Sequence, residues 1–302
     1  MKITIVGLGL VGGCMSIDLR KAGFASELLG VDLNPEHGKK AVELGLVDRI
    51  ESEEIALSQS DVIILAIPVN TMSALLPQVL DVVKKGAVVI DTGSTKSMIC
   101  KSVSSHPNRH QFVASHPIAG TENSGPEAAF SGLFLNKTNI ICESEKSAKG
   151  SLELAGKIFT ILGMNTILMD PEEHDKHVAY VSHLSHVSSF LLGQTILDIE
   201  KDEKNIFNLA GSGLTSTVRL AKSSPDMWAP IFEQNAEYLG QALAEYIMHL
   251  QKFHYQLMKK NTKELYRVMK EANKIRFVLD GLTSTSADTT GKIESKQLNF
   301  TK

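Results

Sequence analysis

The feature that most constrains the fold is a set of three glycines close to the N-terminus. Gly7, Gly9 and Gly12 stand in the order G-x-G-x-x-G, after the apolar run Lys2–Val6 and before residues 10–22, whose apolar positions have helical spacing. In a strand–turn–helix unit the first glycine permits a tight turn, the second lets the backbone approach a pyrophosphate, and the third lets helix and strand pack closely. The helix N-terminus adds partial positive charge. The pattern predicts a dinucleotide site at Gly7, Leu8, Gly9, Leu10, Val11 and Gly12.

An acidic residue after the second predicted strand indicates which dinucleotide binds. Residues 28–31 form that strand, and Asp32 follows it, about twenty residues after the last glycine, where a carboxylate accepts hydrogen bonds from the adenosine ribose. The same carboxylate repels a 2′-phosphate, and no arginine follows it directly. We therefore expect NAD rather than NADP as the cofactor. The end of the third strand supplies the edge of the same site, with Ala66, Ile67 and Pro68.

Strand-like and helical stretches alternate over the first half of the chain. Residues 62–67 and 88–90 are nearly all apolar, which is typical of strands covered on both faces, and shorter strand-like pieces follow at 112–114, 139–142 and 166–169. This predicts an α/β fold whose N-terminal Rossmann-type domain has a parallel sheet. Strand signals stop near residue 170, and helical periodicity continues at 173–198, 228–250 and 262–279. We predict an NAD-binding domain at 1–170, an all-helical substrate and dimerisation domain at 171–282, and a polar tail at 283–302.

Composition and charge exclude several classes of partner. The net charge of −3 contains no block of like charge, so we expect neither nucleic acid nor an anionic membrane as a partner. The chain has no signal-peptide pattern and no apolar run of about 18 residues, so a cytoplasmic protein is expected. Cys14, Cys100 and Cys142 lie far apart and outside metal-ligand spacing, so no metal is expected. Apolar residues on several faces of 173–198 favour a homodimer.

Two polar loops follow predicted strands, at the sheet edge where ligands gather. The first contains Ser94, and the second, residues 115–122, has His116 at the end of a short strand. Oxidation of an alcohol by hydride transfer needs a base that titrates near neutrality, and histidine is the side chain whose ordinary pKa lies there. Position alone therefore makes His116 a candidate base, with an ordinary loop histidine as the equal alternative.

Five segments, taken in order, carry a resemblance to a known family. They are the glycine-rich start and residues 93–96, 115–122, 182–186 and 219–228. With them the chain resembles prephenate dehydrogenase of bacterial tyrosine biosynthesis, and arogenate and cyclohexadienyl dehydrogenases share much of the pattern. The resemblance implies NAD-dependent oxidative decarboxylation of prephenate to 4-hydroxyphenylpyruvate. The alternatives are arogenate or cyclohexadienyl specificity, and a non-catalytic NAD-binding regulator on the same scaffold.

The resemblance also implies roles for individual residues. His116 would bond the ring hydroxyl of the substrate, and Ser94 would orient the imidazole or touch the same hydroxyl. Arg219 would bind a substrate carboxylate, for which its planar, permanently charged guanidinium is suited. His183 and His186 are three residues apart and share one face of a helix, and the sequence does not choose which of them faces the substrate. The rim of the pocket or the domain interface would include Thr121 and Glu122.

Overall fold

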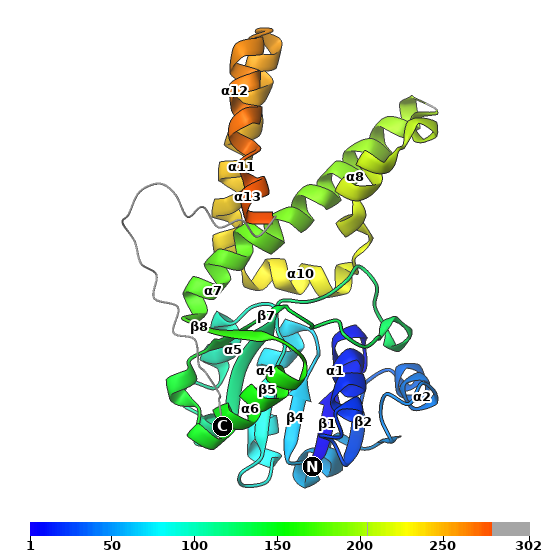
Figure 1. The fold of residues 1–302 in the computed structure, drawn as a ribbon, viewed down its shortest axis with the longest axis vertical. Helices are drawn as coiled ribbons and strands as arrows, with labels where there is room; N and C mark the ends of the chain where they lie inside the picture. The colour runs from blue at the N-terminus through cyan, green and yellow to red at the C-terminus, as the bar shows by residue number, and fades with distance from the viewer. Residues whose placement is uncertain (204, 280–302) are drawn as a thin grey trace. The chain divides into compact units, whose positions relative to one another are not determined.

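An eight-stranded sheet organises the first part of the chain in this computed structural model, which describes residues 1–203 and 205–279 (Figure 1). The strand order is β3-β2-β1-β4-β5-β6-β7-β8. The strands are β1 (Lys2–Val6), β2 (Glu27–Val31), β3 (Arg49–Ile50), β4 (Val62–Leu65), β5 (Val88–Asp91), β6 (Phe112–Pro117), β7 (Thr138–Cys142) and β8 (Asn165–Met169). The central strands β4 and β5 are buried along their whole length, as their apolar sequences predict. The predicted Rossmann-type domain is confirmed.

Neighbouring strands run parallel except for β6 and β7, which are antiparallel. A parallel pair needs a crossover connection, usually an α-helix, whereas residues 118–137 hold only the short 3-10 helix η2 (Pro126–Ala128). The chain therefore returns in the opposite direction. The predicted parallel sheet is therefore confirmed with one antiparallel pair in it, and the two-residue strand β3 was too short to give a sequence pattern.

Helices cover both faces of the sheet. One apolar core includes residues of α1 (Leu10–Lys21), α2 (Pro35–Glu43) and α6 (Lys149–Ile161). The other includes residues of α3 (Glu53–Gln59), α4 (Val69–Val82) and α5 (Ser97–Ser102). Two further 3-10 turns are η1 (Arg109–Gln111) and η3 (Ser144–Lys146).

The described chain after β8 is helical, as predicted. Helix α7 (Pro171–Val178) begins where Asp170 accepts hydrogen bonds from two backbone N–H groups of the first turn and Pro171 takes the first helical position. A π-helical turn, η4 (Ala179–His183), connects it to α8 (Leu184–Asp202). The elements that follow are η5 (Ile206–Leu209), α9 (Ser212–Thr217), η6 (Arg219–Lys222), α10 (Pro225–Gln234), α11 (Ala236–Met258), α12 (Thr262–Ala272) and α13 (Ile275–Leu279).

Two of the predicted helices are each interrupted. The helix expected over 228–250 breaks at Asn235, whose backbone leaves the helical region at φ −110° and ψ 26° and whose buried side chain bonds to another element. The helix expected over 262–279 breaks between α12 and α13. Apolar spacing continues across both breaks, so periodicity alone did not reveal them.

The described residues form two compact units, residues 1–239 and 240–279, so the boundary falls within α11. All candidate site residues lie in the first unit. The domain boundary expected at residue 170 stays a prediction, and residues 280–282 and the polar tail at 283–302 lie outside the described residues. None of the helices in the described part of the chain is long and apolar enough to cross a membrane.

Candidate active site

The glycine loop lies where the strand order reverses, between β1 and its neighbour β4. A Cβ atom on Gly7 would lie 2.3 Å from the carbonyl oxygen of Ala66, and one on Gly12 would lie 2.2 Å from that of Gly7, so both positions require glycine. A Cβ atom on Gly9 would meet no atom of the described residues within 4 Å, apart from its chain neighbours. The loop is therefore closed against the sheet on one side and open at Gly9.

Helix α1 begins at this loop, and no side chain of the described residues caps its N-terminus. Gly9 is the N-cap, and the first turn of the helix holds no acidic residue. Asp32 accepts hydrogen bonds from the backbone N–H groups of Leu8 and Asn34, both at 2.8 Å, and its side chain is 12% exposed. A carboxylate has about four acceptor positions, so Asp32 holds the loop and retains capacity for a ribose hydroxyl. Leu8 and Leu10 are buried, and they can offer a ligand only their backbone.

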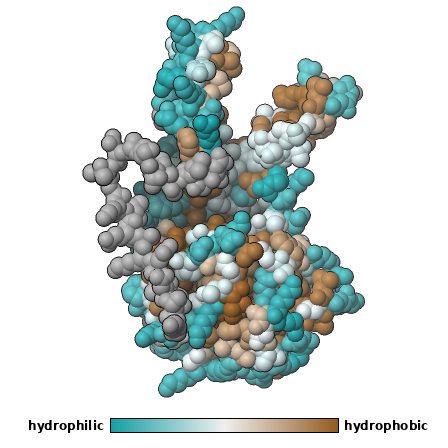
Figure 2. All heavy atoms as spheres, in the orientation of Figure 1, coloured by the Kyte–Doolittle hydropathy of each residue, from teal (hydrophilic) through white to brown (hydrophobic). Residues whose placement is uncertain are grey.

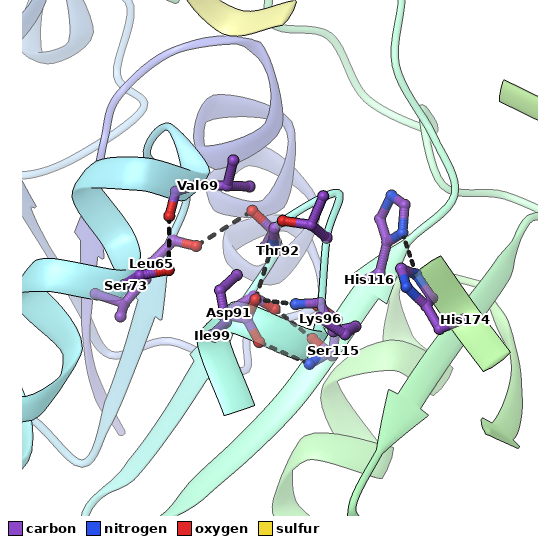
Figure 3. A network of polar contacts seen from close by, with 12 residues as sticks. Leu65, Val69, Ser73, Asp91, Thr92, Lys96, Ile99, Ser115, His116 and His174 are labelled. Carbon is purple, nitrogen blue, oxygen red and sulfur yellow. Dashed lines mark hydrogen bonds and ion pairs between the residues drawn. The ribbon is translucent and has the colours of Figure 1, made fainter. Parts of the chain in front are cut away.

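Two histidines and an aspartate form a hydrogen-bonded chain beside the end of β6. Figure 3 shows the contact between the two histidines, His116 and His174. Nδ1 of His116 lies 2.8 Å from Nε2 of His174, and Nδ1 of His174 lies 2.8 Å from Oδ1 of Asp175. An ionised carboxylate only accepts, so His174 carries its proton on Nδ1 and accepts at Nε2. His116 then donates from Nδ1, which leaves a lone pair on its Nε2. This is the tautomer that a general base needs.

The protonation of these groups follows from their burial. Burial lowers the pKa of His116 well below its ordinary value, and the nearby His174, Lys96 and His183 lower it further. Burial raises the pKa of Asp175, but hydrogen bonds from His174 and Ser97 outweigh this effect and the net shift is downward. At neutral pH the arrangement is therefore a neutral imidazole at His116 and a carboxylate at Asp175.

The two histidines of the helical segment have different surroundings. His183 is 1% exposed, and its Nδ1 lies 3.0 Å from the amide nitrogen of Asn235, which also donates to the carbonyl of Asp175 at 2.7 Å. Burial lowers the pKa of His183 to about 4. His186 is half-buried, donates from Nδ1 to the carbonyl of Ser182 and stacks on Trp228 with ring centroids 3.4 Å apart. Its Nε2 has no hydrogen-bond partner among the described residues, so His186 is the better placed to bind a ligand.

Arg219 is paired with Glu122 across two elements. Its Nη1 lies 2.7 Å from Oε2 of Glu122, and half of the arginine side chain is exposed. Arg219 is close enough to His186 to lower its pKa, although burial lowers it more. The edge of the His183 ring meets Trp228 at 5.9 Å between centroids. Both His183 and His186 therefore contact Trp228, and His183 is close enough to His116 to lower its pKa.

The remaining predicted residues lie in the surrounding loops. Ser94 is half-buried after β5, and no hydrogen bond joins it to His116 in the described part of the chain. Its neighbour Thr95 is fully buried and donates to Gln234 of α10 at 2.7 Å. Thr121 accepts from the backbone of Asn123 at 3.2 Å. Among the residues described, no cluster of His, Cys, Asp and Glu has the geometry of a metal site.

Two family models match the chain one after the other. Residues 15–168 match the nucleotide-binding domain of prephenate dehydrogenase, and residues 170–271 match its dimerization domain. The chain belongs to the prephenate dehydrogenase family. The prephenate dehydrogenase of Bacillus subtilis is 29% identical over 292 residues, which cover 93% of this chain and 76% of that protein.

Solved structures of the prephenate dehydrogenase family agree with this assignment. The prephenate dehydrogenase of A. aeolicus, in complex with hydroxyphenyl propionate and NAD+, has a TM-score of 0.84 and 31% identity, with 93% of this chain and 98% of that chain covered. The arogenate dehydrogenase of Synechocystis has a TM-score of 0.72 and 30% identity, with 91% and 99% covered. The similar structures are thus named as a prephenate dehydrogenase and as an arogenate dehydrogenase.

Sequence reasoning missed the partners of the candidate base in this prephenate dehydrogenase family member. His174 and Asp175 lie in the helix that starts at Asp170 and Pro171, and both are buried although they are polar. Two adjacent polar side chains in the first turns of a helix resemble a solvated surface in sequence. The one sequence feature that separates this pair from ordinary surface residues is that a histidine next to an aspartate can form a hydrogen bond with it.

Proposed function

We propose that this protein oxidises prephenate with NAD and releases carbon dioxide and 4-hydroxyphenylpyruvate. The observation that carries the proposal is the hydrogen bond between His116 and His174, which leaves Nε2 of His116 as an acceptor, together with the guanidinium of Arg219 near His186. This combination fits a ring alcohol that also carries a carboxylate. A non-catalytic regulator would have no need for an imidazole held in one tautomer.

The loop at Gly7, Gly9 and Gly12 suits NAD. The space in front of Gly9 and the uncapped start of α1 suit a pyrophosphate, and Asp32 suits an unphosphorylated ribose. Ala66, Ile67 and Pro68 follow the neighbouring strand, and the carbonyl of Ala66 packs against Gly7. When bound, NAD supplies the acceptor for a hydride.

The other steps, proton transfer and substrate binding, are assigned to side chains of this protein. Nε2 of His116 accepts the proton of the ring hydroxyl, while His174 and Asp175 hold the imidazole and stabilise its positive charge. Arg219 binds a substrate carboxylate in place of, or together with, Glu122. His186 accepts a hydrogen bond from the substrate at Nε2. Residues at the edge of the pocket complete the site, namely Ser94, Thr121, Glu122 and His183.

Arogenate is the second candidate substrate. It carries an amino group where prephenate carries a keto group, and the carboxylate of Glu122 beside Arg219 offers an acceptor for an ammonium. The similar arogenate dehydrogenase of Synechocystis also favours this candidate. A cyclohexadienyl dehydrogenase would use both substrates.

We further propose a homodimer formed by the helical domain at 171–282. Apolar side chains remain exposed on α8 and α11 in the single chain, and Figure 2 shows apolar residues at the surface over α8. They include Leu191, Leu197 and Ile199 on α8 and Ile247, Leu250, Phe253 and Leu257 on α11. A second copy would remove this surface from water, which is favourable by roughly 25 cal/mol per Å². Sedimentation at two protein concentrations tests this, and a monomer at both would contradict it.

The function is tested by steady-state assays of NADH or NADPH formation with prephenate and arogenate. We expect turnover of prephenate with NAD, and little turnover in the variant His116→Asn. If the protein oxidises arogenate and not prephenate, the proposed substrate is arogenate. If neither substrate is oxidised while NAD still binds, the proposed function is wrong.

A further inference from the structure

A fully buried ion pair lies next to Ser115, the residue that precedes the candidate base His116. Nζ of Lys96 pairs with Oδ2 of Asp91, and both side chains are 0% exposed (Figure 3). Removing two charges from water costs several kcal/mol for each ion, and a well-packed apolar pair is often as stable. The pair is therefore weak as a device for stability alone, and its neighbours indicate another role.

The ion pair joins β5 to β6 beyond the end of their backbone ladder. The ladder pairs Val89 with Phe112 and Ile90 with Val113, and it stops there. At the next position Asp91 Oδ1 accepts from the backbone N–H of Ser115 at 2.7 Å, and the Ser115 hydroxyl donates to the Asp91 carbonyl. Nζ of Lys96 donates to the Ser115 carbonyl at 2.7 Å. Ser115 directly precedes His116, so these bonds hold the backbone that carries the imidazole.

Lys96 also reaches the other end of the histidine chain. Its backbone N–H donates to Oδ1 of Asp175 at 2.7 Å, the same oxygen that bonds to His174. One residue therefore fixes the strand that carries His116 and the carboxylate that orients its partner. The ammonium of Lys96 is part of neither the glycine loop at Gly7 to Gly12 nor the group of aromatic rings near Arg219.

We propose that Lys96 is a positioning residue for the reaction, because its ammonium holds Ser115 and its backbone N–H holds Asp175, so that His116 and its partner His174 are fixed together. The inference rests on the proposed function, in which His116 is the base. The charge of Lys96 lowers the pKa of His116 and of His174, although burial lowers both more. His174 of α7 and His183 of η4 also act on the pKa of His116, and Asp175 of α7 and Asp91 of β5 act on that of His174. The thiols of Cys100 on α5 and Cys142 on β7 interact electrostatically with the same ion pair.

The test compares two ways of changing the pair. The double variant Asp91→Asn, Lys96→Met removes both charges and leaves no unpaired ion, whereas Asp91→Asn alone leaves the ammonium without its counter-ion. Lys101→Met is the control, because Lys101 is an exposed lysine on α5. The protonation of His116 is followed in the protein without ligands by NMR of isotope-labelled histidine, with its signal assigned by its loss in His116→Asn. The pH profile of kcat/KM and the affinity for NAD are measured on the same variants.

The two changes should move the titration of His116 in opposite directions. In the double variant we expect its midpoint, and the acid limb of kcat/KM, to move up by about one pH unit, with kcat/KM at least about tenfold lower. In Asp91→Asn the midpoint should move down. Unchanged midpoints in both variants would overturn the proposal, as would a shift in the same direction in both. Loss of NAD binding in both variants would mean that the ion pair is needed for the fold of the protein, and this result would also overturn the proposal. The NMR result stands even if the unaltered protein oxidises neither substrate, so failure of the proposed function is seen separately.

Discussion

The imidazole of His116 is held by His174, with 2.8 Å between Nδ1 of the first ring and Nε2 of the second. In His174→Ala the ring of His116 loses this partner and its fixed tautomer. We expect kcat to fall by about ten- to a hundredfold, with KM for the substrate little changed, because misplacement of a reacting group by about 1 Å can cost a hundredfold. His110→Ala, at an exposed histidine, is the control. A kcat in His174→Ala equal to that of the control would exclude this role.

The glycine loop predicts opposite behaviour for two similar substitutions. In Gly9→Ala the new methyl meets no atom of the described residues within 4 Å, apart from its chain neighbours, so the fold should be as stable as before, while NAD binding weakens at least about tenfold because the methyl occupies the space proposed for the pyrophosphate. In Gly12→Ala the methyl would lie 2.2 Å from a carbonyl oxygen, so we expect a clear loss in Tm. Isothermal titration calorimetry measures the affinity for NAD, and scanning calorimetry measures the Tm of both variants. Equal NAD affinity in Gly9→Ala and the unaltered protein would place the cofactor elsewhere.

Removal of the carboxylate at Asp32 should change the preference between cofactors. We expect Asp32→Ser to lower the ratio of kcat/KM for NAD over NADP by about tenfold or more, since one ribose acceptor and one repulsion of the 2′-phosphate are lost together. Glu36→Gln removes an exposed carboxylate from the start of α2 and should leave the ratio unchanged. The measurement is the kinetics of both variants with both cofactors. An unchanged ratio in Asp32→Ser would show that Asp32 serves only to hold the loop.

Arg219 should act on substrate binding. Arg219→Gln loses a charged partner for a carboxylate, which is worth about 1.5–3 kcal/mol, so KM should rise by about ten- to a hundredfold while kcat changes less. Lys222→Gln removes a positive charge from the same 3-10 turn and provides a matched control. Steady-state kinetics separates the two parameters. A fall in kcat with KM unchanged would argue against a role in binding the carboxylate.

Stability should decrease in acid because of the buried histidines. Burial lowers the pKa of His183 to about 4, whereas the unfolded chain has an ordinary histidine pKa of about 6.5. Between these values the unfolded chain takes up a proton that the folded chain refuses, so the free energy of unfolding falls as the pH falls from about 6.5 to about 4. His183 alone accounts for about 3 kcal/mol, and His116 and His174 shift in the same direction. Urea unfolding followed by circular dichroism at several pH values measures this. A free energy that stays constant over this range would contradict it.

The parts of the molecule that local sequence determines were predictable. Gly7, Gly9, Gly12 and Asp32 act within one strand–turn–helix–strand unit, and the buried strands are short apolar runs, so spacing alone located them. The partner of His116 was not predictable, because His174 lies 58 residues further along the chain and approaches only when α7 packs near β6. The break at Asn235 follows from a bond to Asp175, 60 residues away. Such long-range bonds leave no periodic pattern in the sequence.

Trp228, which stacks on His186, is the one tryptophan of the 302-residue chain. The tryptophan fluorescence of the protein therefore originates beside the proposed substrate pocket. An indole in contact with an imidazole is quenched more strongly when that ring gains a proton, so this emission responds to the charge of the histidines that Trp228 contacts, His186 and His183. The molecule thus carries its own optical probe, with which ligand occupancy can be titrated without any label.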